Sequence, residues 1–310
     1  MENMEKSNGK EAEAFPGIEA AKEVGQISYK ALQKAKGMIK PGVRLIDVAQ
    51  EVESYIKESK YGAAFPLNIS INNEAAHYTP SIGDAKVFSD GDLVKVDFGA
   101  EKEGALGDCA VTVDLSGKMQ TLVDAVDDAL KAAISIAKAG VKVREIGKVI
   151  EKTIMLKGYQ PIRNLGGHTV GLHELHSSIF VPNYDNGDET VLEEGMLVAI
   201  EPFATTGKGM VTESDVCEIY AYDMETQIRT KEARTLLGLI QKNYPTEPFA
   251  VRWLANSMDS SFSIYAGIAE LSRRGALIPY PTLIEISGGA VSQAEAEIFI
   301  EKDGCEVVTK

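Results

Sequence analysis

The sequence contains little cysteine: three residues in a chain of 310, at Cys109, Cys217 and Cys305. The number is odd, the spacings are long, and no Cys-x-x-Cys pair occurs. This pattern argues against a disulfide-stabilised secreted domain and against a thiolate zinc site, and it indicates a reducing compartment. We therefore expect a cytoplasmic protein.

Long apolar runs and an excess of positive charge are also absent. No segment reaches the length of a membrane span, and Met1 to Lys10 contain no apolar core of a signal peptide. The chain has 32 basic and 46 acidic residues, a formal net charge of −14. Because phosphate binding requires a basic face, we expect neither nucleic acid nor an anionic membrane as a partner. A hydrophobic content of 44% predicts a globular protein with an ample core.

What is present is a repeat. Apolar residues at helical spacing predict one helix between Gly17 and Pro41 and a second from Leu45 to Ile56. Shifting the chain against itself by 98 residues places this pair on a second one. The matched positions are Val24 and Leu122, Leu32 and Leu130, Ala35 and Ala133, Met38 and Ile136, Val48 and Ile146, Val52 and Ile150, Ile56 and Ile154, and Tyr61 and Tyr159. The repeat predicts two similar halves, each a helix pair with strands.

Strands are expected at Phe65–Ile71, before a turn at Asn72 and Asn73, and in a hairpin over Val94–Val113. Folding this hairpin about a two-residue turn at Lys102 and Glu103 would place Asp97 directly opposite Asp108. Two facing carboxylates repel each other unless one is protonated or a cation lies between them. The alternative for a lone hairpin is a pair of unrelated surface aspartates.

The repeat extends to these acidic strands and decides between the two interpretations. The segment from Gly91 to Asp97 matches Gly195 to Glu201, and the segment around Asp108 matches that around Glu295. If the halves pack about a pseudo-two-fold axis, four carboxylates converge at the centre of the molecule. Matched acids at equivalent strand positions are harder to explain by chance than matched apolar residues.

The four histidines lie in two loops that flank the acidic strands. His168, His173 and His176 fall between Asn164 and His176, and His77 lies before Tyr78. Shifted by 98 residues, His77 falls beside His176. This clustering favours metal ligation and proton chemistry over ordinary loop polarity.

One imidazole and four carboxylates suit Mn(II), Fe(II), Co(II) or Zn(II), and five such side chains can bridge two ions about 3.5–4 Å apart. A water bridging two such ions becomes hydroxide near neutral pH, which suits hydrolysis of a carbonyl or a phosphoryl group. Spacing alone does not choose between amide and phosphate.

The second half contains a long insertion between Glu201 and Glu295. Helices are expected from Thr230 to Ile240, at 248–255 and at 262–271, with Gly275 as a stop. This predicts an inserted helical subdomain at 228–280 and a catalytic domain at 1–227 and 281–310. Three short helices can form a DNA-binding module, but the weak basic excess of the insertion favours a structural subdomain.

Together these motifs resemble the methionine aminopeptidases of type II, with an archaeal-like short N-terminus. The resemblance lies in the segments 96–99, 167–168, 199–204 and 291–295, in Asp108, in the insertion, and in the runs 65–72, 77–80 and 175–176. It covers the chain from about residue 17. The family implies an α+β pita-bread (creatinase/aminopeptidase) fold: two pseudo-two-fold-related halves with a curved antiparallel sheet, plus the helical insert.

The resemblance also implies roles and partners. The implied reaction removes the N-terminal methionine of nascent proteins and peptides with a small second residue, by attack of a metal-bridging hydroxide. The implied cofactors are two divalent ions (Co, Mn, Fe, Zn or Ni), with Glu201 also a general base. Their ligands would be Asp97, Asp108, His168, Glu201 and Glu295. His77 and His176 would bind the substrate backbone and assist catalysis, and Phe65 and Tyr280 would line the methionine pocket. A monomer that acts near the ribosome is expected, because the duplicated chain builds its own two-fold site.

Two departures from the family stand out. The family often has histidine after the last glutamate, where this chain has Ala296, and the Thr169–Glu174 loop differs from type II sequences. We interpret His173 in that loop as non-catalytic and Gln293 as a support of its strand. The alternatives are an Xaa-Pro peptidase of the same fold, which would carry an extra N-terminal domain, and a non-catalytic binding scaffold, which would have lost metal ligands.

Overall fold

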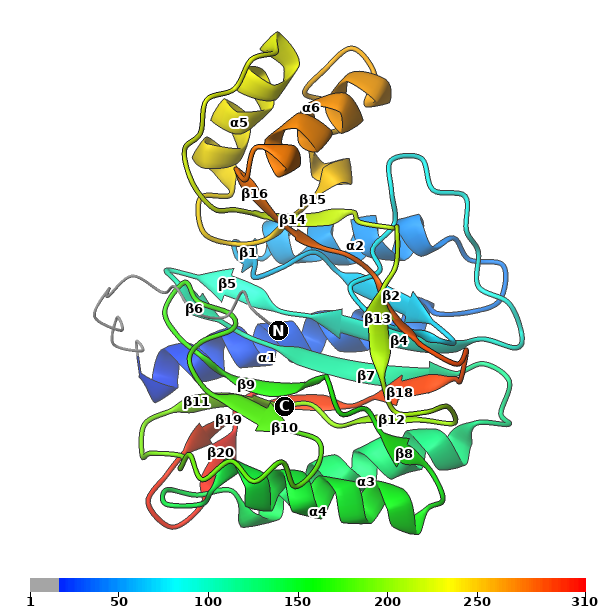
Figure 1. The fold of residues 1–310 in the computed structure, drawn as a ribbon, viewed down its shortest axis with the longest axis vertical. Coiled ribbons are helices and arrows are strands. Elements are labelled where there is room, and N and C mark those ends of the chain that lie inside the picture. The colour runs from blue at the N-terminus through cyan, green and yellow to red at the C-terminus, as the bar shows by residue number, and fades with distance from the viewer. Residues whose placement is uncertain (1–16) are drawn as a thin grey trace.

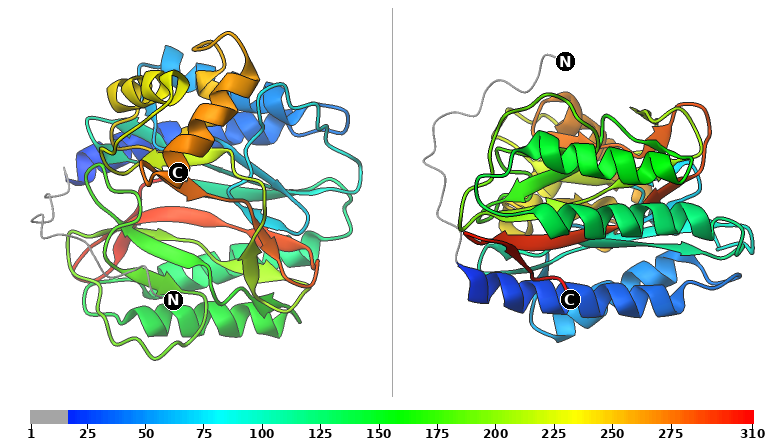
Figure 2. Two further views of the ribbon diagram at one scale, coloured as in Figure 1. Left: turned by 45° about the horizontal axis from the view of Figure 1, so that its top comes forward. Right: turned by 90° about the horizontal axis from the view of Figure 1, so that it is seen from below.

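The computed structural model describes residues 17–310 and contains the predicted helix pair twice (Figure 1). The first pair is α1 (Ile18–Met38) and α2 (Leu45–Glu58), and the second is α3 (Gln120–Ile136) and α4 (Val143–Leu156). Helix α4 begins and ends 98 residues after α2. The right-hand view of Figure 2 separates the blue α1 and α2 from the green α3 and α4. The duplication predicted from the apolar pattern is therefore confirmed.

A sheet of eight antiparallel strands joins the two halves. The order is β10-β9-β11-β19-β7-β4-β2, with β20 paired to β19. The strands are β2 (Asn68–Ile71), β4 (Leu93–Phe98), β7 (Cys109–Asp114), β9 (Gly166–Val170), β10 (Phe180–Pro182), β11 (Leu197–Ile200), β19 (Glu295–Ile300) and β20 (Cys305–Val307). The halves meet where β19 pairs with β7, so Glu295 lies opposite Ala110.

Each half has its own hydrophobic core between helices and sheet. In the first half Val52 and Ile56 of α2 pack with the buried residues of β2 and β4. In the second half Ile150 and Ile154 of α4 pack with those of β11 and β19. In each half the apolar face of the helices covers one face of the sheet. The opposite face of the sheet is therefore free for polar side chains.

The hairpin of the first half has a different register from the predicted one. Strand β5 (Ala100–Lys102) pairs with β6 (Ala105–Leu106), so the turn residues are Glu103 and Gly104. Their φ angles of 52° and 84° are those of a type I′ turn, which glycine adopts easily. Asp97 therefore pairs with Ala110, and the prediction that it faces Asp108 directly was wrong by two residues.

The predicted strand at Phe65–Ile71 is confirmed only from Asn68 onward, because β2 begins there. The turn at Asn72 and Asn73 is confirmed, and it leads into β3 (Glu74–Ala76). Four small sheets complete the body and the insert. Their remaining strands are β1 (Gly62–Ala63), β3 (Glu74–Ala76), β8 (Gln160–Pro161), β12 (Phe203–Thr205), β13 (Val211–Glu213), β14 (Ile219–Tyr222), β15 (Phe249–Ala250), β16 (Leu277–Tyr280), β17 (Leu283–Glu285) and β18 (Val291–Gln293).

The insert stands on the body at the top of Figure 1. It contains α5 (Lys231–Asn243) and α6 (Ser261–Arg273), and Thr230 caps α5 by accepting a hydrogen bond from the Ala233 amide. The prediction of a helix at 248–255 was wrong, because this segment forms β15 and a short 3-10 helix, η1 (Val251–Leu254). Strand β14 lies between β15 and β16, and pairing with β14 replaces helical hydrogen bonds at 249–250.

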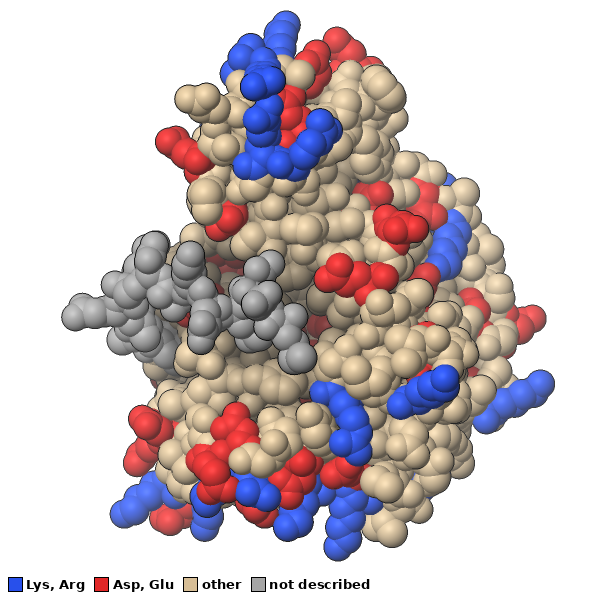
Figure 3. All heavy atoms as spheres, in the orientation of Figure 1, with Lys and Arg blue, Asp and Glu red and all other residues tan. Residues whose placement is uncertain are grey.

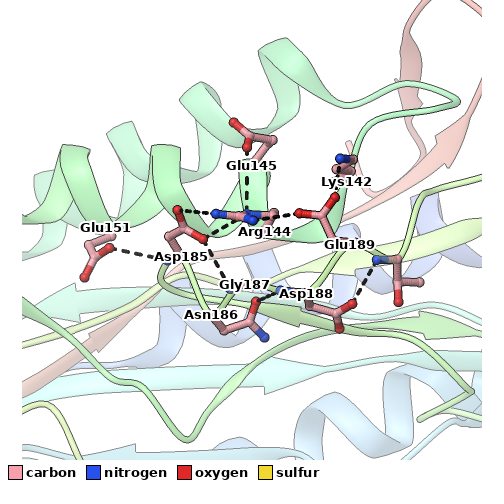
Figure 4. A network of polar contacts seen from close by, with 10 residues as sticks. Lys142, Arg144, Glu145, Glu151, Asp185, Asn186, Gly187, Asp188 and Glu189 are labelled. Carbon is pink, nitrogen blue, oxygen red and sulfur yellow. Dashed lines mark hydrogen bonds and ion pairs between the residues drawn. The ribbon is translucent and has the colours of Figure 1, made fainter.

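Charged side chains are distributed unevenly over the surface. Lys and Arg gather on the insert at the top of Figure 3. At the start of α4, Arg144 donates to Asp185 at 3.0 Å and to Glu189 at 2.7 Å, which ties the 183–191 loop to the helix (Figure 4). Such exposed pairs contribute little stability individually. Within residues 17–310, no helix is long and apolar enough to cross a membrane.

Candidate metal centre and substrate pocket

Five predicted ligands converge on one cavity of about 340 Å³ at the middle of the sheet. Asp97 lies near the end of β4, and Asp108 directly precedes β7. Glu201 follows β11, Glu295 opens β19, and His168 is the central residue of β9. Strands from both halves therefore place their polar side chains at the seam of the sheet.

The distances within this group are short. The Nε2 atom of His168 lies 3.5 Å from Asp108 Oδ2 and 3.8 Å from Glu201 Oε1. One side-chain atom each of Asp108, His168 and Glu295 lie within 4.8 Å of one another. An ion between these side chains would have ligands from both halves.

Gln293 joins the other two carboxylates, and sequence reasoning missed this role. Its Nε2 donates to Asp97 Oδ2 at 3.2 Å and to Glu201 Oε2 at 3.3 Å. The available signal was its position two residues before Glu295, because alternate residues of an extended chain point to the same side.

Burial of several acidic side chains close together dominates the electrostatics of the site. It raises the pKa of Asp97 to about 7, although hydrogen bonds from Gln293 and Asp108 act in the opposite direction. Burial, followed by the nearby Asp97, raises the pKa of Asp108 well above its usual range. Burial and the charges of Asp108 and Asp97 do the same for the pKa values of Glu201 and Glu295. Without a compensating cation, these four carboxyls cannot all be ionised at neutral pH.

The donor set fits divalent metal. Asp97 Oδ1 and Glu295 Oε2 are buried and have no hydrogen-bond partner among residues 17–310. Burial, followed by the neighbouring His176, lowers the pKa of His168 to about 3, so its imidazole is neutral, as ligation requires. Hard carboxylate oxygens with one imidazole match the preferences of first-row divalent ions.

The other predicted site residues line the same cavity. His77, His176, Phe65 and Tyr280 are all part of its wall. The His176 ring lies edge-on to His168 with 4.4 Å between centroids, and Tyr280 lies 5.7 Å from His77 and 6.4 Å from His176. His77 has φ 66°, an unusual angle for a residue other than glycine, found here at a functional cavity. Burial lowers the pKa of His77 to about 4 and that of His176 below its ordinary value.

His173 lies elsewhere. Its Nδ1 is 3.0 Å from Glu247 Oε1, and its backbone amide donates to Gly104. It does not line the cavity. It joins the site loop to the insert and to the hairpin of the first half, which agrees with its interpretation as a non-catalytic residue.

Comparison with known proteins identifies the family to which this arrangement belongs. The model of metallopeptidase family M24 matches residues 19–229. The chain belongs to metallopeptidase family M24. It is 44% identical to a methionine aminopeptidase of Pyrococcus horikoshii over 93% of this chain and 98% of that protein.

Solved structures agree with this assignment at the level of the fold. A methionine aminopeptidase of Thermotoga maritima has a TM-score of 0.69 and 25% identity, covering 95% of this chain and 96% of that one. A thermophilic Arx1 has a TM-score of 0.82 and 18% identity, with coverages of 94% and 90%. The solved structures confirm the predicted pita-bread fold. The family confirms the predicted metal-dependent hydrolase, because the M24 members are metallopeptidases.

Proposed function

We propose that this M24 enzyme removes the N-terminal methionine from nascent proteins and peptides whose second residue is small. It acts as a type II enzyme with two divalent ions held by Asp97, Asp108, His168, Glu201 and Glu295. The observation that carries the proposal is the convergence of these five side chains on one buried cavity with an apolar wall.

The wall of the cavity supports methionine as the side chain that is bound. Phe65 is 6% exposed, and it lines the cavity together with Leu175, Ile219 and Tyr280. A thioether is flexible and polarisable, and sulfur–aromatic contacts are favourable. The cavity volume of about 340 Å³ leaves room for the N-terminal residue of a peptide.

The chain's own residues then perform the proton chemistry. Divalent ions, when bound, polarise a carbonyl and lower the pKa of a coordinated water. Glu201 takes the proton of the attacking water and passes it to the leaving amine. His77 and His176 are neutral at physiological pH, and each can donate one N–H to the scissile carbonyl as negative charge develops on its oxygen.

A monomer in the cytoplasm is the expected working form. Both halves of the site come from one chain, so no partner subunit is needed to complete it. Cytoplasmic activity would give access to nascent chains close to the ribosome, and the cysteine pattern is that of a reducing compartment.

Cleavage of Met-Ala-Ser and Met-Lys-Ser, with and without chelator, tests the proposal. We expect turnover of Met-Ala-Ser only, loss of activity on chelation, recovery with Mn(II) or Co(II), and two ions per chain by mass spectrometry. Equal turnover of both peptides in every condition would contradict the proposed function. Preferential cleavage of Ala-Pro would favour the Xaa-Pro alternative, and absence of all cleavage by the metal-loaded protein would favour a scaffold.

A further inference from the structure

Asn68 is a cavity residue to which neither the proposed mechanism nor the family resemblance assigns a role. It is 5% exposed, lines the cavity and pairs with Asp97 across β2 and β4. Cross-strand partners present their side chains on the same face, with Cβ atoms about 4.5–5.5 Å apart. Asn68 therefore stands beside the acidic centre on the side of the first half.

The orientation of the Asn68 amide is fixed by one hydrogen bond. Its Nδ2 donates to the Pro66 carbonyl oxygen at 2.8 Å. A flipped amide would place two acceptors against each other, so Oδ1 must occupy the opposite position. This Oδ1 is buried and has no partner among residues 17–310. A buried acceptor without a donor is unfavourable, so a ligand that supplies the donor is stabilised at this position.

The missing donor has a definable chemistry. Asn68 lies opposite Asp97, which is one of the proposed metal ligands, so the donor to Asn68 Oδ1 must lie next to the metal site. A neutral carbonyl oxygen at this place favours a substrate group that carries N–H donors and is itself attracted to the metal site. The α-amino group of a peptide is such a group, and only a free N-terminus offers it.

We propose that Asn68 Oδ1 accepts a hydrogen bond from the substrate's free α-amino group and so helps to restrict the enzyme to N-terminal residues. The inference rests on the proposed function and names a further substrate-binding residue for it. At the duplicated position, 98 residues later, stands Gly166, which also lines the cavity but has no side chain. Recognition of the amine is therefore a property of the first half.

The test compares two ligands that differ only in the amine. Binding of L-methionine and of its desamino analogue, 4-(methylthio)butanoate, is measured by calorimetry on the metal-loaded protein. Asn68→Ala and the nearly isosteric Asn68→Leu should weaken methionine binding roughly 10- to 100-fold, as expected for a hydrogen bond to a charged group. Binding of the analogue and metal content by mass spectrometry should stay unchanged.

Asn183 provides a matched control. Its Nδ2 donates to the Leu165 carbonyl oxygen at 3.0 Å, and its Oδ1 is buried without a partner in the described part of the chain. It does not line the cavity. Asn183→Ala should therefore leave the preference for methionine over the analogue as in the parent protein, whatever it does to thermal stability.

Three results would overturn the inference: an equal loss for both ligands, unchanged methionine binding, or loss of metal in both Asn68 variants. If the parent protein cleaves Met-Ala-Ser while one of these results appears, the proposed function stands and the role of Asn68 does not. If the parent protein neither cleaves Met-Ala-Ser nor prefers methionine to the analogue, both proposals are wrong.

Discussion

The two halves of the molecule share a backbone plan but bring different side chains to the cavity. In the first half Ser70 pairs with Lys95. In the second half His168, which lies 98 residues after Ser70, pairs with Ala199, which lies 104 residues after Lys95. The register of the two ladders is therefore the same. The imidazole at this paired position, His168, is present in the second half only, and the first half supplies aspartates where the second supplies glutamates. Duplication has kept the positions of the strands, while single substitutions have set the chemistry at each position.

The strongest test of this equivalence is in the two cores. Ile56 of α2 and Ile154 of α4 occupy duplicated positions and are 1% and 0% exposed. Replacing either with alanine removes buried methylene groups and leaves a cavity, so each should lower the free energy of unfolding by about 2–5 kcal/mol. Urea denaturation followed by circular dichroism measures both values.

Leu156, 78% exposed near the end of α4, is the control for that comparison. Leu156→Ala should change stability by no more than about 0.5 kcal/mol. If one isoleucine variant changes the free energy of unfolding as little as the control does, the two helix pairs do not stabilise their halves equally. The duplicated halves would then share a backbone arrangement but not an equal contribution to stability.

Gln293 is where the two halves are connected, since its amide holds Asp97 of one and Glu201 of the other. Gln293→Ala should loosen both carboxylates and weaken metal binding about 10- to 100-fold, as is typical for residues that orient metal ligands. Gln293→Glu adds a fifth acid in contact with two others and should be worse. Competition with a chromogenic chelator gives the affinities, and unaltered affinity in both variants would reduce Gln293 to a strand support.

Much of this architecture could be predicted from the sequence because its signals are local or repeated. The apolar periods of α2 and α4 gave two helices of identical length, and matched acids located the seam. The hairpin register could not be read reliably, because Lys102–Glu103 and Glu103–Gly104 both resemble turns and only the φ angles of the folded chain distinguish them. The strand at Phe249 was missed since its pairing with Tyr220 is a long-range contact that local helical spacing does not reveal.

Asn68 and Gln293 were missed for a related reason. Their importance comes from what faces them across strands, Asp97 for the one and a pair of carboxylates for the other. A neutral amide has no sequence signature comparable with a cluster of acids or histidines. Side chains that orient ligands are therefore the part of a site that only the fold reveals.

The smallest expected effect compares the acidic centre with a partly buried acid outside it, Glu218 at the base of the insert. Burial raises the pKa of Glu218 to about 7, although hydrogen bonding to Tyr265 and the charge of Arg252 act in the opposite direction. Its oxygens lie 3.0 and 3.1 Å from the Tyr265 hydroxyl. Burial is the largest cause of this pKa shift, and the nearby charge of Asp84 adds to it.

The sign of the resulting pH dependence follows from the two protonation states. The unfolded chain loses this proton near pH 4.5, the ordinary pKa of a glutamate, and the folded chain near pH 7, so between these pH values the folded protein binds more protons. Stability from this group therefore falls as pH rises from about 4.5 to 7.

Glu218→Gln keeps an acceptor for Tyr265 and removes the cost of ionising a partly buried carboxyl, so it should be more stable than the parent at pH 8 and no more stable at pH 5. Because Glu218 is only partly buried, solvent screening should keep the difference below about 1 kcal/mol. Urea denaturation of the metal-free proteins at both pH values measures it, with exposed Glu225→Gln as control; an equal gain at pH 5 and pH 8 would assign it to packing instead of charge.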